Sequence, residues 1–197
     1  MPLLTPTVLS TERLTLRWLD DNDIDAHFAV FSDPEVTRYW SASPWTGREQ
    51  AAKSIADTVA NYADGSGLRF GIFLNATGEL IGNATLHHFF EQNRRCEIGY
   101  AFGSRHWGHG YAFEALRAVL DYGFRELDLN RVEADVDPRN EASRRVLEKL
   151  GFRKEGTMPE RWIVHGEPAD TVNYGLLRRY WDAPGFLPLD ASALCLL

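Results

Sequence analysis

Cysteine is scarce in this chain of 197 residues, which has only two, Cys96 and Cys195. Small domains with a limited core depend on several paired cysteines, so this scarcity excludes a disulfide framework. It favours a reducing compartment, and we expect a cytoplasmic protein. Hydrophobic residues make up 44% of the chain, which is enough for a core without covalent cross-links.

Long hydrophobic runs are also missing. No apolar stretch approaches the roughly 20 residues that a helix needs to span a bilayer. The first residues, MPLLTPTVLSTERLTLR, lack a basic start followed by an apolar core, and the final ALCLL is too short to act as an anchor. We therefore expect no membrane partner and no signal peptide.

The chain also lacks an excess of positive charge. The formal net charge is −7, which argues against general nucleic-acid binding. Residues 1–93 have 6 Lys+Arg and 12 Asp+Glu, residues 94–154 have 12 and 10, and residues 155–197 have 3 and 6. The basic middle third is either a chance fluctuation or a sign of an anionic ligand there and a cationic ligand elsewhere.

Strand and helix patterns follow one another along the chain. The expected strands cover residues 13–17, 69–75, 76–90, 94–103 and 131–136, with a closing hairpin over 161–177. The expected helices cover residues 20–33, 46–65, 111–126 and 140–150, with a capping box of Thr46 and Glu49, Asn140 as an N-cap and Gly151 as a stop. This order predicts an α/β or α+β domain over residues 1–182 and a C-terminal tail over residues 183–197.

Two glycines, Gly108 and Gly110, directly precede the helix that is expected from Tyr111. Such a loop either shapes a turn or binds an anion, because a helix N-terminus has unpaired N–H groups and the positive end of the helix dipole. The loop lacks the Gly-Lys-Ser/Thr of a Walker motif. Phe113 stands where a dinucleotide fingerprint needs its third glycine, so that pattern fails too.

The motifs around this loop are specific in combination. They read TERLTLR, DPEVTRYW, EIGYAF, GYAFEALRAVLDYGF, NRVEADVDPRNEASRRVLEKLGF and RKEG, with Arg105, Gly108 and Gly110 at the spacing Arg, two residues, Gly, one residue, Gly. Over nearly the whole chain, they resemble the GNAT superfamily of acetyl-CoA-dependent N-acetyltransferases, and in detail its RimJ and RimL branch of ribosomal-protein N-terminal acetyltransferases. The resemblance implies a mixed, mostly antiparallel sheet of six to seven strands, flanked by helices and splayed at its centre.

The resemblance also implies a coenzyme site. Backbone N–H groups at the helix mouth would bind the pyrophosphate, and backbone groups of the preceding strand would bind the pantetheine arm as an added strand would. The implied residues are Tyr100, Ala101, Phe102, Arg105, Trp107, Gly108, His109, Gly110, Tyr111, Ala112, Asn140 and Ser143. Asn140 can serve as a helix N-cap at the same time.

Two residues are candidates for catalysis. Glu97 matches a strand position where other members of the superfamily have a glutamate, and we expect it to act as the base, directly or through a water. The alternative is that Glu97 pairs with Arg94 or Arg95 on a solvated face. Ser143 resembles the serine proposed to protonate the departing thiolate, although it could simply bind the coenzyme sulfur or cap its helix. Tyr100 and Tyr111 are other candidate acids, although packing is the favoured role of both.

No metal site is expected. The pairs His87-His88 and His106-His109 lack a carboxylate or cysteine that would complete a set of ligands. Trp40, Trp45 and Trp162 lie in segments that form the wall of the substrate side in relatives.

The expected function is transfer of acetyl from acetyl-CoA to a primary amine, by direct attack in a ternary complex. The leading acceptor is the α-amine of a protein N-terminus, such as that of a ribosomal protein. The alternatives are a small amine, for example a polyamine or an aminoglycoside, and a non-catalytic acyl-CoA-binding module. The sequence leaves a homodimer open.

Overall fold

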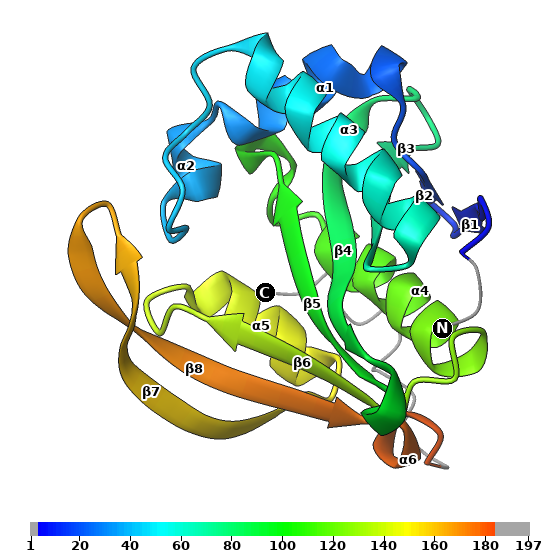
Figure 1. Ribbon diagram of the computed structural model, residues 1–197, viewed down its shortest axis with the longest axis vertical. Coiled ribbons are helices and arrows are strands. Elements are labelled where there is room, and N and C mark those ends of the chain that lie inside the picture. The colour runs from blue at the N-terminus through cyan, green and yellow to red at the C-terminus, as the bar shows by residue number, and fades with distance from the viewer. Residues whose placement is uncertain (1–3, 184–197) are drawn as a thin grey trace.

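The computed structural model describes residues 4–183. Eight strands form one mixed sheet in the order β1-β2-β3-β4-β5-β6-β8-β7, in which only β5 and β6 are parallel (Figure 1). The strands are β1 (Leu9–Ser10), β2 (Leu14–Arg17), β3 (Gly67–Leu74), β4 (Leu80–Phe90), β5 (Arg95–Phe102), β6 (Arg131–Val136), β7 (Arg153–Val164) and β8 (Glu167–Leu177). The predicted fold class is confirmed, and the two-residue β1 brings the number of strands above the expected six to seven. The expected tail over residues 183–197 lies, apart from Ala183, outside the described residues.

Helices cover both faces of the sheet. They are η1 (Asp21–Asp23), α1 (Ile24–Phe31), α2 (Pro34–Thr37), α3 (Arg48–Asp64), η2 (Glu91–Asn93), η3 (Ser104–His106), α4 (Tyr111–Arg125), α5 (Glu141–Lys149) and α6 (Arg178–Trp181). In Figure 1, α1 and α3 lie on one face of β3 and β4, and α4 lies on the other face. Within residues 4–183, no helix is long and apolar enough to cross a bilayer.

The start of α3 differs from the expected capping box. The helix begins at Arg48, and Gly47 is its N-cap, so the third helical position is Gln50 rather than Glu49. The Gln50 side-chain oxygen accepts hydrogen bonds from the N–H groups of Thr46, at 2.7 Å, and Gly47, at 3.1 Å. The predicted start of the helix was wrong by one residue, and only half of a capping box forms, because Gln50 accepts from the backbone as Glu would but Gly47 has no side chain to complete the box.

Alternation along β4 gives its two faces different characters. Ala84 and Leu86 are fully buried in the main core, which includes Leu116 and Leu120 of α4. Asn83, Thr85 and His87 fall on the opposite face, toward α1 and α3, because successive side chains of a strand alternate. This polar row beneath two helices is unusual for a central strand, and it forms the floor of the site described below.

The sheet opens between β5 and β6. Strand β5 pairs with β4 from Glu97 to Phe102. It pairs with β6, its neighbour on the opposite edge, only over Arg95–Glu97, opposite Arg131–Glu133. The two strands diverge beyond Glu97, as Figure 1 shows. The splayed centre that the resemblance implied is therefore present.

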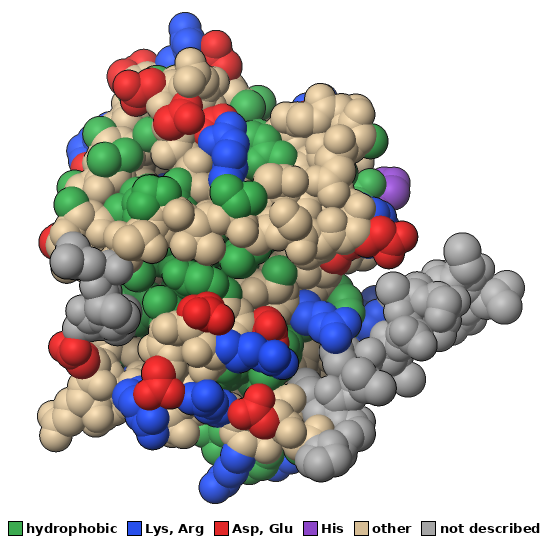
Figure 2. Space-filling view, turned by 90° about the vertical axis from the view of Figure 1, so that its right-hand side faces the viewer, with side chains coloured by type: hydrophobic (Ala, Val, Ile, Leu, Met, Phe, Trp, Pro, Cys, Tyr) green, Lys and Arg blue, Asp and Glu red, His purple; other side chains and the backbone are tan. Residues whose placement is uncertain are grey.

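The closing hairpin is longer than expected, because β7 begins at Arg153 rather than near residue 161. Register shifts between Lys154 and Gly156 and between Met158 and Trp162 interrupt its pairing with β8, which is why no regular alternation was visible in the sequence. Figure 2 shows acidic and basic side chains interspersed on the side that faces right in Figure 1.

Candidate active site

The glycine loop leads directly into α4. Gly108 and Gly110 have φ angles of +79° and +78°, a left-handed conformation that glycine adopts without steric cost. The backbone N–H groups of residues 108–113 donate to no acceptor among the described residues. The N–H of Trp107 does not belong to this row, because it donates to the Ser104 carbonyl at 3.2 Å. The loop thus presents a row of free donors at the positive end of a 15-residue helix.

Two arginines lie beside this loop. Arg105, which the sequence singled out, is exposed and forms an ion pair with Glu79. Arg13 was missed. Its Nη1 donates to the His109 carbonyl at 2.9 Å, and its Nε lies 2.6 Å from the Glu114 carboxylate. No local pattern marks Arg13, because 96 residues separate it from His109.

The Glu114 carboxylate joins the N-terminal strands to α4. It accepts hydrogen bonds from the Thr11 hydroxyl at 2.6 Å and from the Arg13 N–H at 2.9 Å. Burial opposes its ionisation, but the hydrogen bonds from Thr11 and Arg13 outweigh burial and lower the pKa of Glu114. The ionised side chain fixes Arg13 against the loop.

The free edge of β5 faces the opening. The Gly103 N–H donates to the Ile81 carbonyl of β4 at 2.9 Å. Because backbone groups alternate along a strand, Ala101 also directs its N–H and C=O toward β4, while Tyr100 and Phe102 direct theirs toward β6. The Phe102 carbonyl accepts from the Trp107 indole at 2.8 Å. Of the three residues expected to bind the pantetheine arm, Tyr100 therefore has the most accessible backbone groups.

A hydrogen-bonded chain crosses the opening from β5 to α5. The Tyr100 hydroxyl lies 2.7 Å from the Ser143 hydroxyl, and the Asn140 side chain accepts from the Ser143 N–H at 3.1 Å. Asn140 is therefore the N-cap of α5, as predicted. Burial raises the pKa of Tyr100, and the hydrogen bond with Ser143 offsets only part of that effect, so the phenol keeps its proton.

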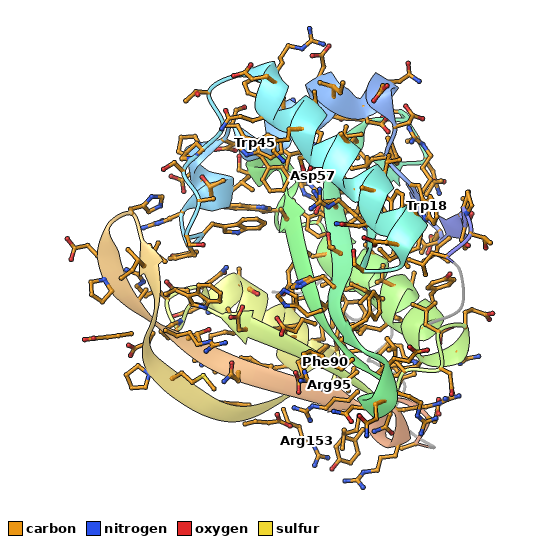
Figure 3. The ribbon with its side chains drawn as sticks, in the orientation of Figure 1. Trp18, Trp45, Asp57, Phe90, Arg95 and Arg153 are labelled. Atoms are coloured by element: carbon orange, nitrogen blue, oxygen red, sulfur yellow. The ribbon has the colours of Figure 1, made fainter. Side chains whose placement is uncertain are left out.

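Glu97 does not pair with a neighbouring arginine. Arg94 pairs with Asp128 at 3.0 Å, and Arg95 pairs with Glu133 at 2.7 Å. Figure 3 shows Arg95 beside Phe90, whose ring centre lies 3.7 Å from the guanidinium carbon. The alternative that the sequence left open for Glu97 is thus wrong, because both arginines have other partners.

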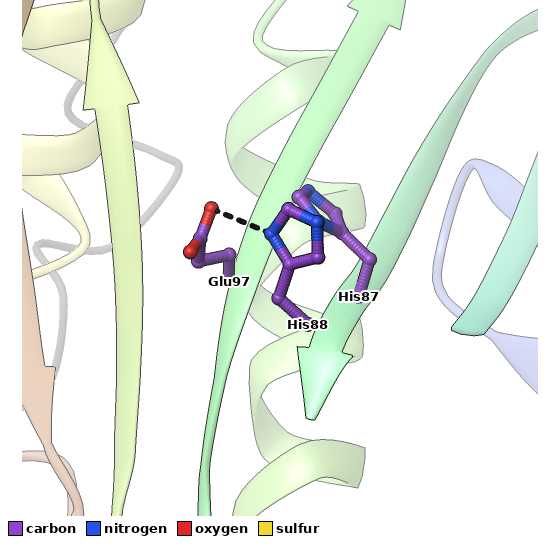
Figure 4. Close-up of side chains that lie close together, drawn as sticks. All are labelled: His87, His88 and Glu97. Atoms are coloured by element: carbon purple, nitrogen blue, oxygen red, sulfur yellow. Dashed lines mark ion pairs between the residues drawn. The ribbon is translucent and has the colours of Figure 1, made fainter. Parts of the chain in front are cut away.

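The partner of Glu97 is a histidine (Figure 4). The Glu97 Oε2 lies 3.2 Å from the Nδ1 of His88. His88 has a left-handed backbone with a φ of +50°, and the register of β4 with β5 shifts between His87 and Phe90. This irregularity turns His88 toward its neighbour, so that the two imidazoles meet edge to face at 4.5 Å.

His87 is the more enclosed of the two histidines, and the sequence gave no reason to place it in the site. Burial lowers its pKa, and the charges of His88 and Arg69 lower it further, whereas Glu97 and Asp135 act in the opposite direction. The imidazole is therefore neutral near pH 7 and able to accept a proton. Its Nε2 lies directly above Gly99 of β5, where an added Cβ would be 3.5 Å away.

The expectation that no carboxylate completes a ligand set with His87 and His88 was wrong. One ligand atom from each of His87, His88 and Glu97 lies within 4.8 Å of the others. The pairing of β4 with β5 places Glu97 directly opposite His87, ten residues away in sequence. Two of these side chains, Glu97 and His88, form a direct carboxylate–imidazole contact, which is a geometry suited to proton transfer.

Two cavities meet at His87. The first, of about 270 Å³, lies along the opening, and its lining includes Glu97, Tyr100, Asn140, Ser143 and Trp162. The second, of about 390 Å³, lies beneath α1 and α3, and its lining includes Phe31, Trp45 and Arg69. Both share Trp40, His87, Gly99 and Tyr100. The three tryptophans singled out from the sequence thus all line this double cavity.

Comparison with known proteins identifies the family of the chain. The family described as acetyltransferase (GNAT) domain matches residues 13–153. The chain belongs to the GNAT family and is an N-acetyltransferase.

Individual relatives cover most of the chain. Uncharacterized N-acetyltransferase YoaA of Bacillus subtilis is 42% identical over 171 residues, which are 87% of this chain and 97% of the relative. The [ribosomal protein uS5]-alanine N-acetyltransferase of Escherichia coli is 29% identical over 188 residues, 90% of this chain and 93% of the relative. The structure of Mycobacterium smegmatis RimJ in complex with CoA-disulfide has a TM-score of 0.83, with 24% identity, and covers 95% of this chain and 94% of its own. That likeness concerns the fold.

Proposed function

We propose that this protein transfers an acetyl group from acetyl-CoA to a primary amine, and that its leading acceptor is the α-amine of a protein N-terminus. The observation that carries the proposal is the end of β5–β6 pairing at Glu97, beside the free amides of residues 108–113. The relative from Escherichia coli acts, by its name, on an alanine of a ribosomal protein, and RimJ was solved with a form of CoA.

The free amides supply the phosphate contacts. The N–H groups from Gly108 to Ala112 bind the pyrophosphate, and the two glycines allow close approach of the backbone. Arg13 and Arg105 add positive charge at the same place. The pantetheine arm follows the exposed edge of β5 at Tyr100, and Asn140 and Ser143 contact it from α5.

The amine must lose a proton before it attacks. An α-amine with a pKa near ~7.8 costs about 1 kcal/mol to deprotonate at pH 7, whereas a lysine near ~10.4 costs about 4.6 kcal/mol. Glu97 takes this proton directly or through a water, and neutral His87 is the second acceptor within reach of both cavities. A modest base of this kind suits an α-amine better than a lysine side chain.

The transfer then proceeds without a covalent acyl-enzyme. The nitrogen lone pair forms a bond to the thioester carbon, and the carbonyl oxygen becomes an oxyanion that a backbone N–H of β5 stabilises. The attacking nitrogen then carries one proton too many for an amide and passes it to the neutral His87 imidazole. Collapse of this intermediate breaks the C–S bond. The sulfur leaves as a thiolate that takes a proton from Ser143, whose hydrogen-bonded neighbour Tyr100 holds a proton of its own. A thiol with a pKa near ~8.5 leaves readily, so this acid assists and is not indispensable.

A polyamine is the second candidate acceptor. The first cavity is lined by the carboxylates of Glu97, Asp135, Asp137 and Asp170 and by no lysine or arginine. Such a lining attracts a polycation as well as a single amine.

Thiol release from acetyl-CoA tests the proposal. We expect turnover with peptides that have a free N-terminus, and little with the same peptides acetylated. Turnover restricted to polyamines or aminoglycosides would favour a small-molecule acceptor. Binding of acetyl-CoA without turnover on any amine would contradict the enzymatic proposal and favour a binding module.

A further inference from the structure

Arg69 of β3 is a cation without a carboxylate partner. Its Nε donates to the Thr85 hydroxyl at 3.1 Å and its Nη1 to the Ser54 hydroxyl at 2.8 Å, both of which are neutral. No carboxylate of the described residues forms an ion pair with it, although most arginines of this part of the chain have one. Asp57 is exposed on α3 and pairs with Lys53 at 2.6 Å.

The position of Arg69 makes this lack of a partner informative. The side chain lies under α3 and lines the second cavity, where it is the only lysine, arginine, aspartate or glutamate. Burial lowers the pKa of Arg69, and Tyr62 and Asp57 oppose that effect. A guanidinium nevertheless stays charged in proteins, so the cavity contains a cation that an anion would stabilise.

A second residue of the same cavity gives independent evidence that a hydrogen-bond acceptor binds there. Asn83 is 3% exposed, and its side-chain nitrogen is buried without any hydrogen-bond partner. It lines the same cavity as Arg69 and lies on the same face of β4 as Thr85. A buried amide nitrogen can only donate, so Asn83 requires an acceptor oxygen, and a carboxylate would supply it together with the counter-charge that Arg69 lacks.

The two cavities differ in charge. Carboxylates line the first, and Arg69 is the charged group of the second, with His87 at their junction. A molecule that occupies both would place its amine toward Glu97 and a negative group toward Arg69. Thr85, whose hydroxyl accepts from Arg69, lies two residues from His87 on the same face of β4, so the two ends of such a molecule would occupy neighbouring positions along one strand.

We propose that the acceptor carries a carboxylate in addition to its amine, and that Arg69 and Asn83 bind this carboxylate. An N-terminal peptide with glutamate or aspartate at its second position is such an acceptor, because adjacent Cα atoms are only about 3.8 Å apart and the acidic side chain extends from the second of them. The inference rests on the proposed amine acetylation and narrows its substrate class. It excludes a simple polycation as the preferred acceptor.

Matched acceptors test this inference. The amidated peptides Ala-Glu-Ala and Ala-Gln-Ala differ by one charge, and ε-aminocaproate and its amide form a smaller pair. We expect kcat/KM for the acid of each pair to exceed that of its amide by about 10- to 100-fold. Equal values in both pairs, or a preference for polyamines, would overturn the inference while leaving acetylation intact. Absence of turnover with every amine would instead overturn the proposed function and this inference together.

Variants connect the preference to the cavity. Arg69→Gln and, separately, Asn83→Leu should bring the acid-to-amide ratio of kcat/KM toward one, and Arg69→Lys should retain part of it. Arg117→Gln removes an exposed arginine of α4 and should leave the ratio unchanged. Thermal unfolding and acetyl-CoA affinity identify any variant that fails to fold. A well-folded Arg69→Gln or Asn83→Leu protein that keeps the full preference would contradict the assignment.

Discussion

Gly108 and Gly110 occupy a conformation that other L-amino acids adopt only at a cost of roughly 1–2 kcal/mol. An added Cβ at Gly108 would contact nothing within 4 Å, so strain alone limits substitution there. In the proposed coenzyme site, the glycines allow the free backbone donors at the start of α4 to face the phosphates. A change from glycine to alanine therefore tests their role.

Gly108→Ala should weaken acetyl-CoA binding by about 5- to 30-fold, because the strained loop leaves its binding conformation for part of the time. Isothermal titration calorimetry with acetyl-CoA measures this. The matched control is Gly65→Ala, which ends α3 with a φ of +73° and equally open surroundings. Gly65→Ala should lose similar stability and bind normally. Unchanged affinity in Gly108→Ala would remove the loop from the coenzyme site.

Glu97→Gln should lower kcat by about 100-fold, because the amine loses its proton acceptor. The remaining rate should rise with pH up to the pKa of the amine, near ~7.8 for an α-amine, since only the neutral form attacks. A pH profile of kcat/KM together with acetyl-CoA affinity checks this, and the affinity should not change. Glu167→Gln, at an exposed position of β8, is the control. An unaltered profile in Glu97→Gln would transfer the role of base to another group, with His87 the first to examine.

At the scale of elements, the hydrogen bond of Tyr100 with Ser143 joins β5 to α5 across an opening that has no backbone pairing. If this pair acts as a unit in protonating the thiolate, Tyr100→Phe and Ser143→Ala should each lower kcat by about tenfold, and the double variant by little more. Tyr122→Phe, a half-buried tyrosine on α4, controls for the loss of a phenol. Fully multiplicative effects would show that the two residues act separately.

The positions of most elements were predictable because their periodicity is local. The turn at Gly78, the helix from Tyr111 and the N-cap at Asn140 each follow from residues within one or two turns of chain. The site was only partly predictable. The resemblance predicted Glu97 and Ser143, and both line the first cavity. The contact of Glu97 with His88 depends on strand register and on an irregularity at His88, which no spacing encodes.

Arg13 and Arg69 show the limit of sequence reasoning more clearly. Arg13 reaches the glycine loop only because β2 packs beside α4, and its partner Glu114 is 101 residues away. Arg69 is informative because no carboxylate of the described residues forms an ion pair with it. Such a missing partner can be recognised only when the positions of all neighbouring residues are known. Long-range contacts of this kind follow from tertiary packing, which single-sequence patterns do not specify.

At the scale of the whole molecule, His27 makes the stability of the fold depend on pH. The side chain is fully buried, and its Nε2 lies 3.3 Å from the Ser54 hydroxyl that also binds Arg69. Burial lowers the pKa of His27 to about 3, and the nearby charge of Arg69 contributes to that effect. In the unfolded chain the pKa of a histidine is near ~6.5.

The unfolded state therefore binds more protons than the folded state between pH 6.5 and about 3, so the free energy of unfolding falls as the pH decreases through this range. The loss between pH 7 and 5 should be about 2 kcal/mol from this residue. Urea unfolding at several pH values should show a smaller loss in His27→Gln than in the parent protein. His165→Asn, in the exposed β7–β8 turn, should behave like the parent. Equal acid sensitivity in His27→Gln would assign the effect to other groups.

The short pairing of β5 with β6 has a consequence for the length of the acyl chain. Three paired residues on each strand close one end of the opening, so a thioester arm bound as proposed, entering from the mouth of α4, would stop where Glu97 meets Glu133. The backbone hydrogen bonds between the two strands at this closed end would leave no room for further methylene groups. In the proposed complex a longer acyl chain would have to bend toward His87 and take up the space that the incoming nucleophile needs.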